Sequence, residues 1–399
     1  MPLILIPYVS RTIGLERYGI SEFSLELAAF FGTIILYGFD FTMSKNLSRS
    51  RHDSSYFSKL FWNVFYSRIA IGIIIIPFFW ITGIYFVDDL FTKTILLYSF
   101  LFFISRLFSS WWFFQGIENI KWIAIGNFLT KALILFLVVL LVKKEKDYPL
   151  VVFAFGLSQL FVNVLAWTWI IFRYQIQFFI FKLSEIINLL KNSFFTFFNE
   201  LLIIMFTSVN IMIVKNYLSA EDLGLYAATM KVVMITQNLV IQSVSKSLYP
   251  NLALAFNQNL QEYKDRLDIF RNLLVIILIT LAFVIIFGRE IIVQLLFGSG
   301  FSGVTSLLTY VSFLPLFIGL TNMYGWQGLY IMNRERTMSY ISLFVGILSI
   351  SCLLMLIERF GLKGVLIIRN ISEVIIFSLA YFFFQKFYKS EQNKSKGVA

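Results

Sequence analysis

Apolar runs of about 20 residues recur along the whole chain, separated by short polar links. Hydrophobic residues make up 59% of the 399 residues and charged residues only 14%, which is too few for the surface of a soluble protein. A helix crosses the ~30 Å of bilayer hydrocarbon with about 20 residues. The pattern therefore predicts an all-α polytopic membrane protein.

We expect about twelve transmembrane helices, at 1–10, 19–42, 62–87, 94–114, 122–142, 149–171, 193–214, 223–247, 273–296, 304–328, 338–357 and 365–386. The first is too short to cross the bilayer. Its counterpart at 193–214 corresponds to a stretch that would start about twelve residues before Met1. We therefore expect the first helix to be truncated, and a short re-entrant N-terminus is the alternative.

The second half of the chain repeats the first at an offset of 205 residues. Glu16-Arg17-Tyr18-Gly19-Ile20 is followed by Glu221-Asp222-Leu223-Gly224-Leu225, each in a polar link between long apolar runs. Membrane proteins with two similar halves usually hold a substrate between them and rock one half on the other. The predicted organisation is an N-terminal helical bundle at 1–172, a cytoplasmic linker at 173–192, a C-terminal bundle at 193–388 and a polar tail at 389–399. This organisation, two pseudo-symmetric six-helix bundles, is typical of a transporter.

Basic residues predict the orientation. With the N-terminus inside, 18 of the 33 Lys and Arg lie in cytoplasmic segments and 10 in outer links, which places both termini in the cytoplasm. The same bias explains the net charge of +11 without nucleic acid as a partner. The one cysteine, Cys352, excludes a disulfide within the chain. No zinc-ligand spacing or Gly-rich phosphate loop is present, so we expect no metal, no cofactor and no enzyme activity.

Apart from Lys246, Arg289 and Lys386, which are counted with the adjoining links, five basic residues lie inside predicted spans: Arg68, Arg106, Lys131, Lys231 and Arg369. Each would cost at least ~2.5–3.5 kcal/mol at a helix centre facing lipid, so we expect each to face a polar interior or a partner. They are our candidate substrate-binding residues. Snorkelling is the alternative for Arg68 near a span end, and an i,i+4 pair with Glu373 is the alternative for Arg369.

Polar residues also recur at helical spacing on four predicted spans. These stripes are Glu22, Glu26, Thr33, Tyr37 and Asp40; Arg106, Ser109 and Ser110; Thr196, Asn199, Thr207 and Asn210; and Lys231, Asn238, Gln242 and Ser245. Two stripes in each half suggest a shared aqueous cavity. The spans that would line this cavity carry more Arg and Lys than carboxylates, which favours a substrate with an anionic head group. Arg in particular binds phosphate oxygens with two parallel donors. The carboxylates of Asp40, Glu200 and Glu373 are candidates for coupling to a proton or sodium gradient. Their alternative role is to neutralise a neighbouring cation.

Four short stretches resemble a known family. They are Pro7-Tyr8-Val9-Ser10-Arg11-Thr12-Ile13-Gly14 with Glu16 and Tyr18-Gly19-Ile20; Phe113-Phe114-Gln115-Gly116-Ile117-Glu118; Leu218-Ser219-Ala220-Glu221-Asp222-Leu223-Gly224-Leu225-Tyr226; and Gly361-Leu362-Lys363-Gly364-Val365. Together they are similar to the signature of Wzx-type O-antigen and capsular polysaccharide flippases, in the multidrug/oligosaccharidyl-lipid/polysaccharide exporter superfamily. The signature residues here are Arg11, Glu16, Gly19, Gln115, Gly116, Glu118, Glu221 and Gly224.

The resemblance implies a function. Members of this family have twelve helices and move an undecaprenyl-pyrophosphate-linked oligosaccharide from the inner to the outer leaflet of the bacterial inner membrane. It also implies a basic cavity, a coupling ion, and contacts with membrane lipids, a polysaccharide polymerase and a chain-length regulator. It assigns no role to the intramembrane cations, whose candidacy rests on the stripes. The alternatives are a multidrug exporter of the same superfamily, a lipid II flippase, and a membrane-embedded polymerase or glycosyltransferase.

Overall fold

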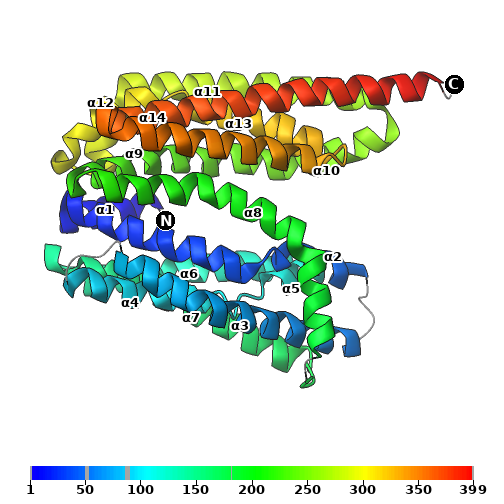
Figure 1. The fold of residues 1–399 in the computed structure, drawn as a ribbon, viewed down its shortest axis with the longest axis horizontal. Helices are drawn as coiled ribbons and strands as arrows, with labels where there is room; N and C mark the ends of the chain where they lie inside the picture. Colours follow the sequence, from blue (N-terminus) through cyan, green and yellow to red (C-terminus); the bar gives the residue numbers. More distant parts are fainter. Residues whose placement is uncertain (1, 50–53, 86–89, 181, 398–399) are drawn as a thin grey trace. The chain divides into compact units, whose positions relative to one another are not determined.

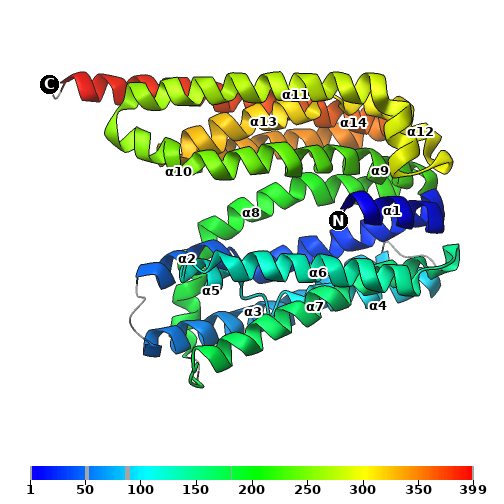
Figure 2. The same cartoon turned by 180° about the vertical axis from the view of Figure 1, so that it is seen from behind.

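The computed structural model describes residues 2–49, 54–85, 90–180 and 182–397. Every regular element within these ranges is a helix, and Figures 1 and 2 show the helices from opposite sides. Long apolar runs can satisfy their backbone hydrogen bonds in lipid only by forming helices or closed barrels. The predicted all-α class is confirmed.

Contacts divide the chain into two compact units, Met1–Asn216 and Tyr217–Ala399. The helices of the first unit are α1 (Pro2–Leu36), α2 (Phe39–Arg49), α3 (Ser54–Tyr85), α4 (Leu90–Ser105), α5 (Trp111–Gly116), α6 (Ile120–Leu141), η1 (Glu145–Asp147), α7 (Tyr148–Arg173) and α8 (Leu183–Tyr217). Those of the second are α9 (Ala220–Thr236), η2 (Gln237–Ile241), α10 (Gln242–Gln258), α11 (Leu260–Leu296), η3 (Ser299–Phe301), α12 (Ser302–Val311), α13 (Leu314–Tyr324), η4 (Gly325–Tyr330) and α14 (Glu335–Gly397).

Eight helices in the described ranges are long and apolar enough to cross a membrane, and a ninth candidate is the pair Ser299–Val311 and Leu314–Tyr330, bent by 45°. Two of the eight hold two predicted spans each. Helix α1 is interrupted at Gly14 (φ 75°) and α14 at Gly361 (φ 55°), where the backbone leaves helical geometry. The chain is therefore a multi-pass membrane protein. Large apolar side chains on its surface agree with this, since Phe172, Phe287 and Met355 are each at least 80% exposed.

Three predicted spans are interrupted in the structure, and the one at 304–328 breaks between α12 and α13, after Val311. The span predicted at 19–42 is broken at Tyr37 and Gly38, which both have positive φ (49° and 66°). The span predicted at 94–114 ends as a helix at Ser105, and residues 106–110 are not helical. Hydrophobic periodicity did not locate these breaks, because apolar residues such as Phe39 and Phe41, or Leu107 and Phe108, follow each of them directly.

The linker predicted at 173–192 is shorter in the structure. Helix α8 begins at Leu183, so the second half of that segment is helical. The division by contacts falls after Asn216, whereas we predicted the second bundle to begin at residue 193. Nearly all of α8 is thus grouped with the first unit.

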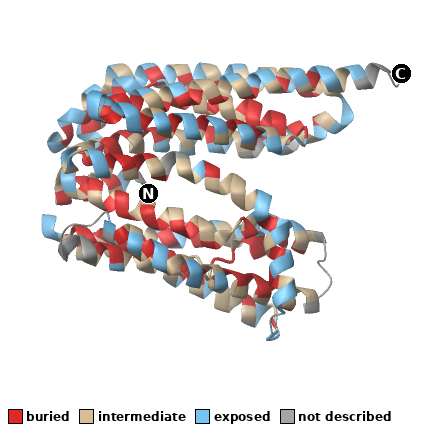
Figure 3. Cartoon of the chain, viewed as in Figure 1, coloured by how far each residue is buried: buried red, intermediate tan, exposed pale blue. Residues whose placement is uncertain are grey.

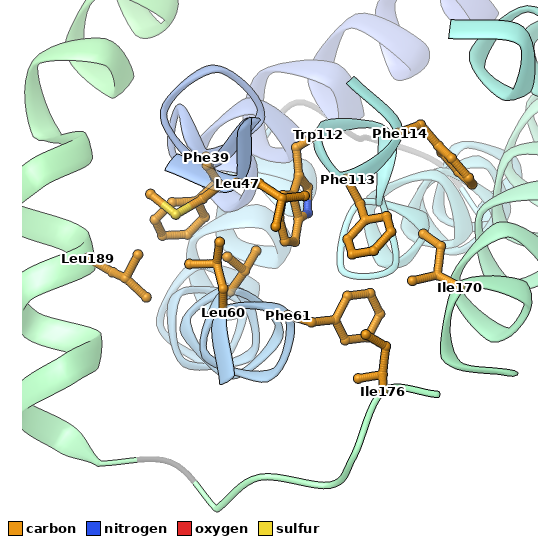
Figure 4. Packing of buried hydrophobic residues seen from close by; sticks show 12 residues of the cluster. Phe39, Leu47, Leu60, Phe61, Trp112, Phe113, Phe114, Ile170, Ile176 and Leu189 are labelled. Atoms are coloured by element: carbon orange, nitrogen blue, oxygen red, sulfur yellow. The ribbon is translucent and has the colours of Figure 1, made fainter. Parts of the chain in front are cut away.

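The core of the first unit is rich in aromatic side chains. Helix α4 packs along α7, α2 against α5, and α1 against α3 and α4. Figure 4 shows one buried cluster in which Phe39 of α2, Phe61 of α3 and Trp112 and Phe113 of α5 converge. In the second unit α13 packs against α11 and α14. Figure 3 shows buried residues running along the helices of both units. In the first unit, Phe39 and Trp112 anchor the segments that follow its two helix breaks in this buried cluster.

Candidate functional site

A charged cluster lies in the first unit, where the break between α1 and α2 meets α3, α8 and the segment after α4. Arg68 on α3 is at its centre and is only 1% exposed. Its Nη2 donates to Oδ1 of Asp40 at 2.8 Å, and its Nη1 donates to the carbonyl oxygen of Ser109. Arg68 is therefore held by an ion pair and by backbone freed at the helix break.

The turn at Tyr37 and Gly38 places Asp40 in this cluster. The backbone of this turn packs directly on α8, because a Cβ on Gly38 would lie only 2.6 Å from the backbone nitrogen of Phe197. The Tyr37 ring stacks on the Phe197 ring with centroids 4.4 Å apart. Only a residue without a side chain allows α1 and α8 to approach so closely. The close packing of α8 on this turn therefore depends on the break between α1 and α2.

Glu200 on α8 joins the same cluster. Its carboxylate accepts a hydrogen bond from the backbone N–H of Gly38, and it lies close enough to Asp40 and Arg68 to interact with both charges. Two carboxylates thus flank one buried guanidinium. The Tyr37–Gly38 turn therefore brings Asp40 and Glu200, the two predicted coupling candidates of the first unit, close together.

Arg106 is the second cation of the cluster. It lies directly after α4, and its guanidinium sits 4.7 Å from the centroid of the Phe102 ring. Asp40 and Arg68 both act electrostatically on it. Its Nε is buried without a hydrogen-bond partner, and no hydrogen bond or ion pair from described residues reaches its guanidinium. Packing and the charges of Asp40 and Arg68 therefore surround Arg106, and none of the described residues accepts a hydrogen bond from it.

The other predicted cation of the first unit, Lys131, lies apart from this cluster. It is exposed on α6, and no hydrogen bond or ion pair joins it to the cluster within the described ranges. A shallow hollow of about 320 Å³ beside the Tyr37 turn carries a different lysine. It is lined by Tyr37, Ile187, Leu190, Lys191 and Phe194.

The remaining candidates belong to the second unit. Arg369 and Glu373 on α14 are 6% and 7% exposed, and Arg369 Nη2 lies 2.8 Å from Glu373 Oε1. This is the i,i+4 pair that the sequence offered as an alternative. Lys231 is half-buried on α9. Each unit thus contains at least one intramembrane ion pair.

The polar stripe that includes Ser245 contributes to a network that sequence reasoning missed. Ser245 Oγ lies 2.5 Å from Asn322 Oδ1, Gln327 Nε2 donates to the Ser245 carbonyl at 3.2 Å, and the Tyr263 hydroxyl donates to the Gln327 carbonyl at 2.7 Å. The π-helix η2 lies within the stripe and adds a residue, which rotates later side chains by about 100°. Ser245 therefore connects helices instead of facing an open cavity.

The signature residues lie mostly at helix breaks and ends. A Cβ on Gly116 would lie 2.8 Å from the Cβ of Leu47, so this glycine lets α5 pack on α2. Glu118 has a positive φ of 58° directly after α5. Arg11, Glu16 and Gly19 flank the interruption of α1, Gln115 lies near the end of α5, and Glu221 and Gly224 lie near the start of α9. Their positions indicate roles in shaping the fold.

No group of three or more His, Cys, Asp or Glu residues in the described ranges could hold a metal ion. The arrangement of the first-unit cluster instead suits an anion. The Nε of Arg106, buried without a hydrogen-bond partner among the described residues, loses about 1–3 kcal/mol of solvation, and an anionic ligand would recover it.

A family model and two named proteins match the sequence of this chain. A family model described as "Polysaccharide biosynthesis protein" matches residues 1–256, more than half of the chain. A protein of Escherichia coli strain K12 named "Putative O-antigen transporter" is 24% identical over 388 residues, which cover 96% of this chain and 92% of that protein. A protein of the same name from Shigella dysenteriae is 20% identical over 379 residues, covering 94% and 93%.

Solved structures show the same architecture. An inward-facing multidrug resistance MATE family transporter of the MOP superfamily matches with a TM-score of 0.81 and 12% identity, over 98% of this chain and 96% of that one. The lipid II flippase MurJ in an inward closed conformation matches with a TM-score of 0.66 and 15% identity, over 96% and 87%. The chain shares the fold of these two transporters, in agreement with the fold that the sequence resemblance implied.

Proposed function

Because the chain belongs to the polysaccharide biosynthesis protein family, we propose that it flips a lipid-linked oligosaccharide across the bacterial inner membrane. The substrate is an undecaprenyl-pyrophosphate-linked repeat unit of a surface polysaccharide, and it moves from the cytoplasmic to the periplasmic leaflet by alternating access. The names of the O-antigen transporter relatives and of the lipid II flippase support this substrate class. No covalent step is involved.

The observation that carries the proposal is the unused guanidinium of Arg106. An intramembrane arginine is costly unless its charge is compensated, and neither a hydrogen bond nor an ion pair from the described residues compensates Arg106. Guanidinium donors match phosphate oxygens in geometry and charge. Irregular backbone at membrane depth is tolerated only where it is buried in protein or lines a water-filled cavity, and Arg106 lies in such a segment. We assign Arg106 to the pyrophosphate.

Arg68 has a different role in the proposal. Its ion pair with Asp40 and its bond to Ser109 hold the α1–α2 turn and the segment after α4 together. Arg68 therefore positions Arg106 without donating to the substrate. Asp40 and Glu200 are the groups that would take up a coupling proton or sodium ion, because both face this guanidinium.

The test is an Arg106→Gln variant in a strain that lacks the protein. We expect polyprenyl-linked units to accumulate on the cytoplasmic face, with transport lowered about tenfold or more, since a charge-assisted hydrogen bond contributes ~1.5–3 kcal/mol. The matched control is Arg173→Gln, which removes the same charge from an exposed position at the end of α7. The measurement is the leaflet distribution of the lipid-linked units, together with the amount of inserted protein.

Three outcomes would contradict the proposal. Wild-type transport by Arg106→Gln would remove this residue from the substrate site. Units that reach the outer face of the deletion strain but stay unpolymerised would indicate a polymerase. Normal intermediates with altered drug sensitivity in the deletion strain would indicate a multidrug exporter.

A further inference from the structure

We infer that Gly32 is a positioning residue for Arg106, and that its missing side chain is the space in which the arginine lies. This inference rests on the proposed role of Arg106 in binding the pyrophosphate. Gly32 is buried on α1, within the second predicted span, and it belongs to none of the polar stripes or signature stretches.

The contacts of Gly32 point to one neighbour. A Cβ built on Gly32 would lie 3.0 Å from Cγ, 3.3 Å from Nε and 3.7 Å from Cδ of Arg106. All three nearest atoms belong to that single side chain. The two shorter distances are tighter than ordinary carbon contacts, so the arginine would have to move.

A second packing contact of Arg106 is also defined. The Phe102 ring, one turn earlier, has its centroid 4.7 Å from the guanidinium carbon and is 8% exposed. Arg106 therefore packs on α1 at Gly32 through its stem and on the Phe102 ring through its guanidinium. Because the guanidinium makes no hydrogen bond to described residues, these two packing contacts determine where its donors point.

A methyl group at residue 32 would push against the aliphatic part of the Arg106 side chain, at Cγ and Cδ. Cγ and Cδ lie close to the backbone, so a small displacement there moves the guanidinium by a larger amount. No hydrogen bond would be lost from the protein. Alanine also favours a helix interior more than glycine does, so the change should not weaken α1 itself. The expected result is a well-folded protein with a misplaced cation.

The experiment compares Gly32→Ala with Gly72→Ala in reconstituted vesicles. A Cβ on Gly72, which is buried on α3, would meet only Leu107 Cδ2 at an ordinary 3.4 Å, so this variant is the matched control. The probe is a fluorescent polyprenyl-diphosphate-linked oligosaccharide, whose movement between leaflets is followed by quenching from outside. Transport is measured at several probe densities, and melting temperatures are measured in detergent.

We expect Gly32→Ala to raise the half-saturating probe density about tenfold, as for the loss of one charge-assisted hydrogen bond, and to keep its melting temperature. We expect Gly72→Ala to match the wild type. In an Arg106→Gln background, Gly32→Ala should add no further loss, because the guanidinium that it would displace is gone.

Other results would overturn the inference in distinguishable ways. If Arg106→Gln transports normally, the proposed substrate site is wrong and the role of Gly32 falls with it. If Arg106→Gln fails while Gly32→Ala behaves as Gly72→Ala does, only the role of Gly32 is wrong. A lower melting temperature for Gly32→Ala, or a further loss in the Arg106→Gln background, would show that the methyl group disturbs the fold instead of the arginine.

Discussion

A buried arginine in a membrane needs compensation, and three arginines of this chain obtain it differently. Arg68 has an ion pair across helices, and Arg369 has one within its own helix. Arg106 has no ion pair within the described residues: the Phe102 ring packs on its guanidinium, and the charge of Asp40 acts on it from farther away. The sequence shows that each cation is costly but cannot show which carboxylate compensates it. Asp40 and Arg68 are 28 residues apart, and their pairing depends on the turn at Gly38.

We expect Asp40→Asn to destabilise the protein by about 3–5 kcal/mol, because it leaves the buried Arg68 charge without its partner. Unfolding in detergent, followed by fluorescence or circular dichroism, measures the change. The control is Glu262→Gln, which removes the partner of exposed Arg266 and should cost only about 0.3–0.5 kcal/mol. An Asp40→Asn variant as stable as this control would show that the pair does not hold the turn.

At the scale of elements, helix breaks decide where charged side chains meet. The sequence indicated the interruptions near Gly14 and Gly361, because polar links separate the predicted spans there. The breaks at Tyr37–Gly38 and after Ser105 lie inside apolar runs and were missed. A tyrosine with positive φ has no sequence signal, since its conformation is imposed by packing against α8.

The break at Gly38 gives a prediction about the fold. Gly38→Ala should destabilise the first unit by at least about 1–2 kcal/mol, the cost of a left-handed non-glycine residue, with a further cost from its clash with α8. Gly288→Ala on α11 is the control, since its Cβ would meet only the Ile292 side chain at 3.6 Å. Melting temperatures of the two purified variants give the comparison. Equal values would mean that α8 can move away from the turn.

The pair within α14 gives a prediction about function. If Arg369 and Glu373 only neutralise each other, a variant with both replaced by methionine should keep wild-type transport and stability. Glu373→Gln alone should lower stability by about 3–5 kcal/mol, since it leaves a buried charge. Leaflet assays and melting curves on the two variants separate these effects. Loss of transport in a stable double variant would instead make Arg369 a substrate ligand or Glu373 a coupling group.

At the scale of the whole molecule, the basic residues predict its orientation in the membrane. In a Cys352→Ala background, Lys146→Cys lies in a predicted outer link and Lys389→Cys at the start of the predicted cytoplasmic tail, and both native side chains are exposed. An impermeant maleimide should label Lys146→Cys in intact spheroplasts and Lys389→Cys only after permeabilisation. The reverse pattern would mean that both termini lie on the outer side.

The sequence by itself determined the class, the multi-pass topology and the family. These follow from properties that are local in the chain: apolar runs long enough to span a bilayer, and short stretches such as Phe113-Phe114-Gln115-Gly116 that carry the resemblance. It also identified every cation of the candidate site, because a charge within an apolar run is conspicuous in any window of sequence.

Only the tertiary structure decided which of these cations act together. Arg68 and Arg106 lie close together because two helices break where periodicity predicted continuous helices. Gly32 and Gly38 also contribute, since they let Arg106 and α8 approach the backbone closely. Lys131, equally conspicuous in the sequence, lies on an exposed face of α6 and does not join them. The physical reason is that compensation of a buried charge depends on distances of a few ångströms between residues far apart in the chain, and packing alone determines these distances.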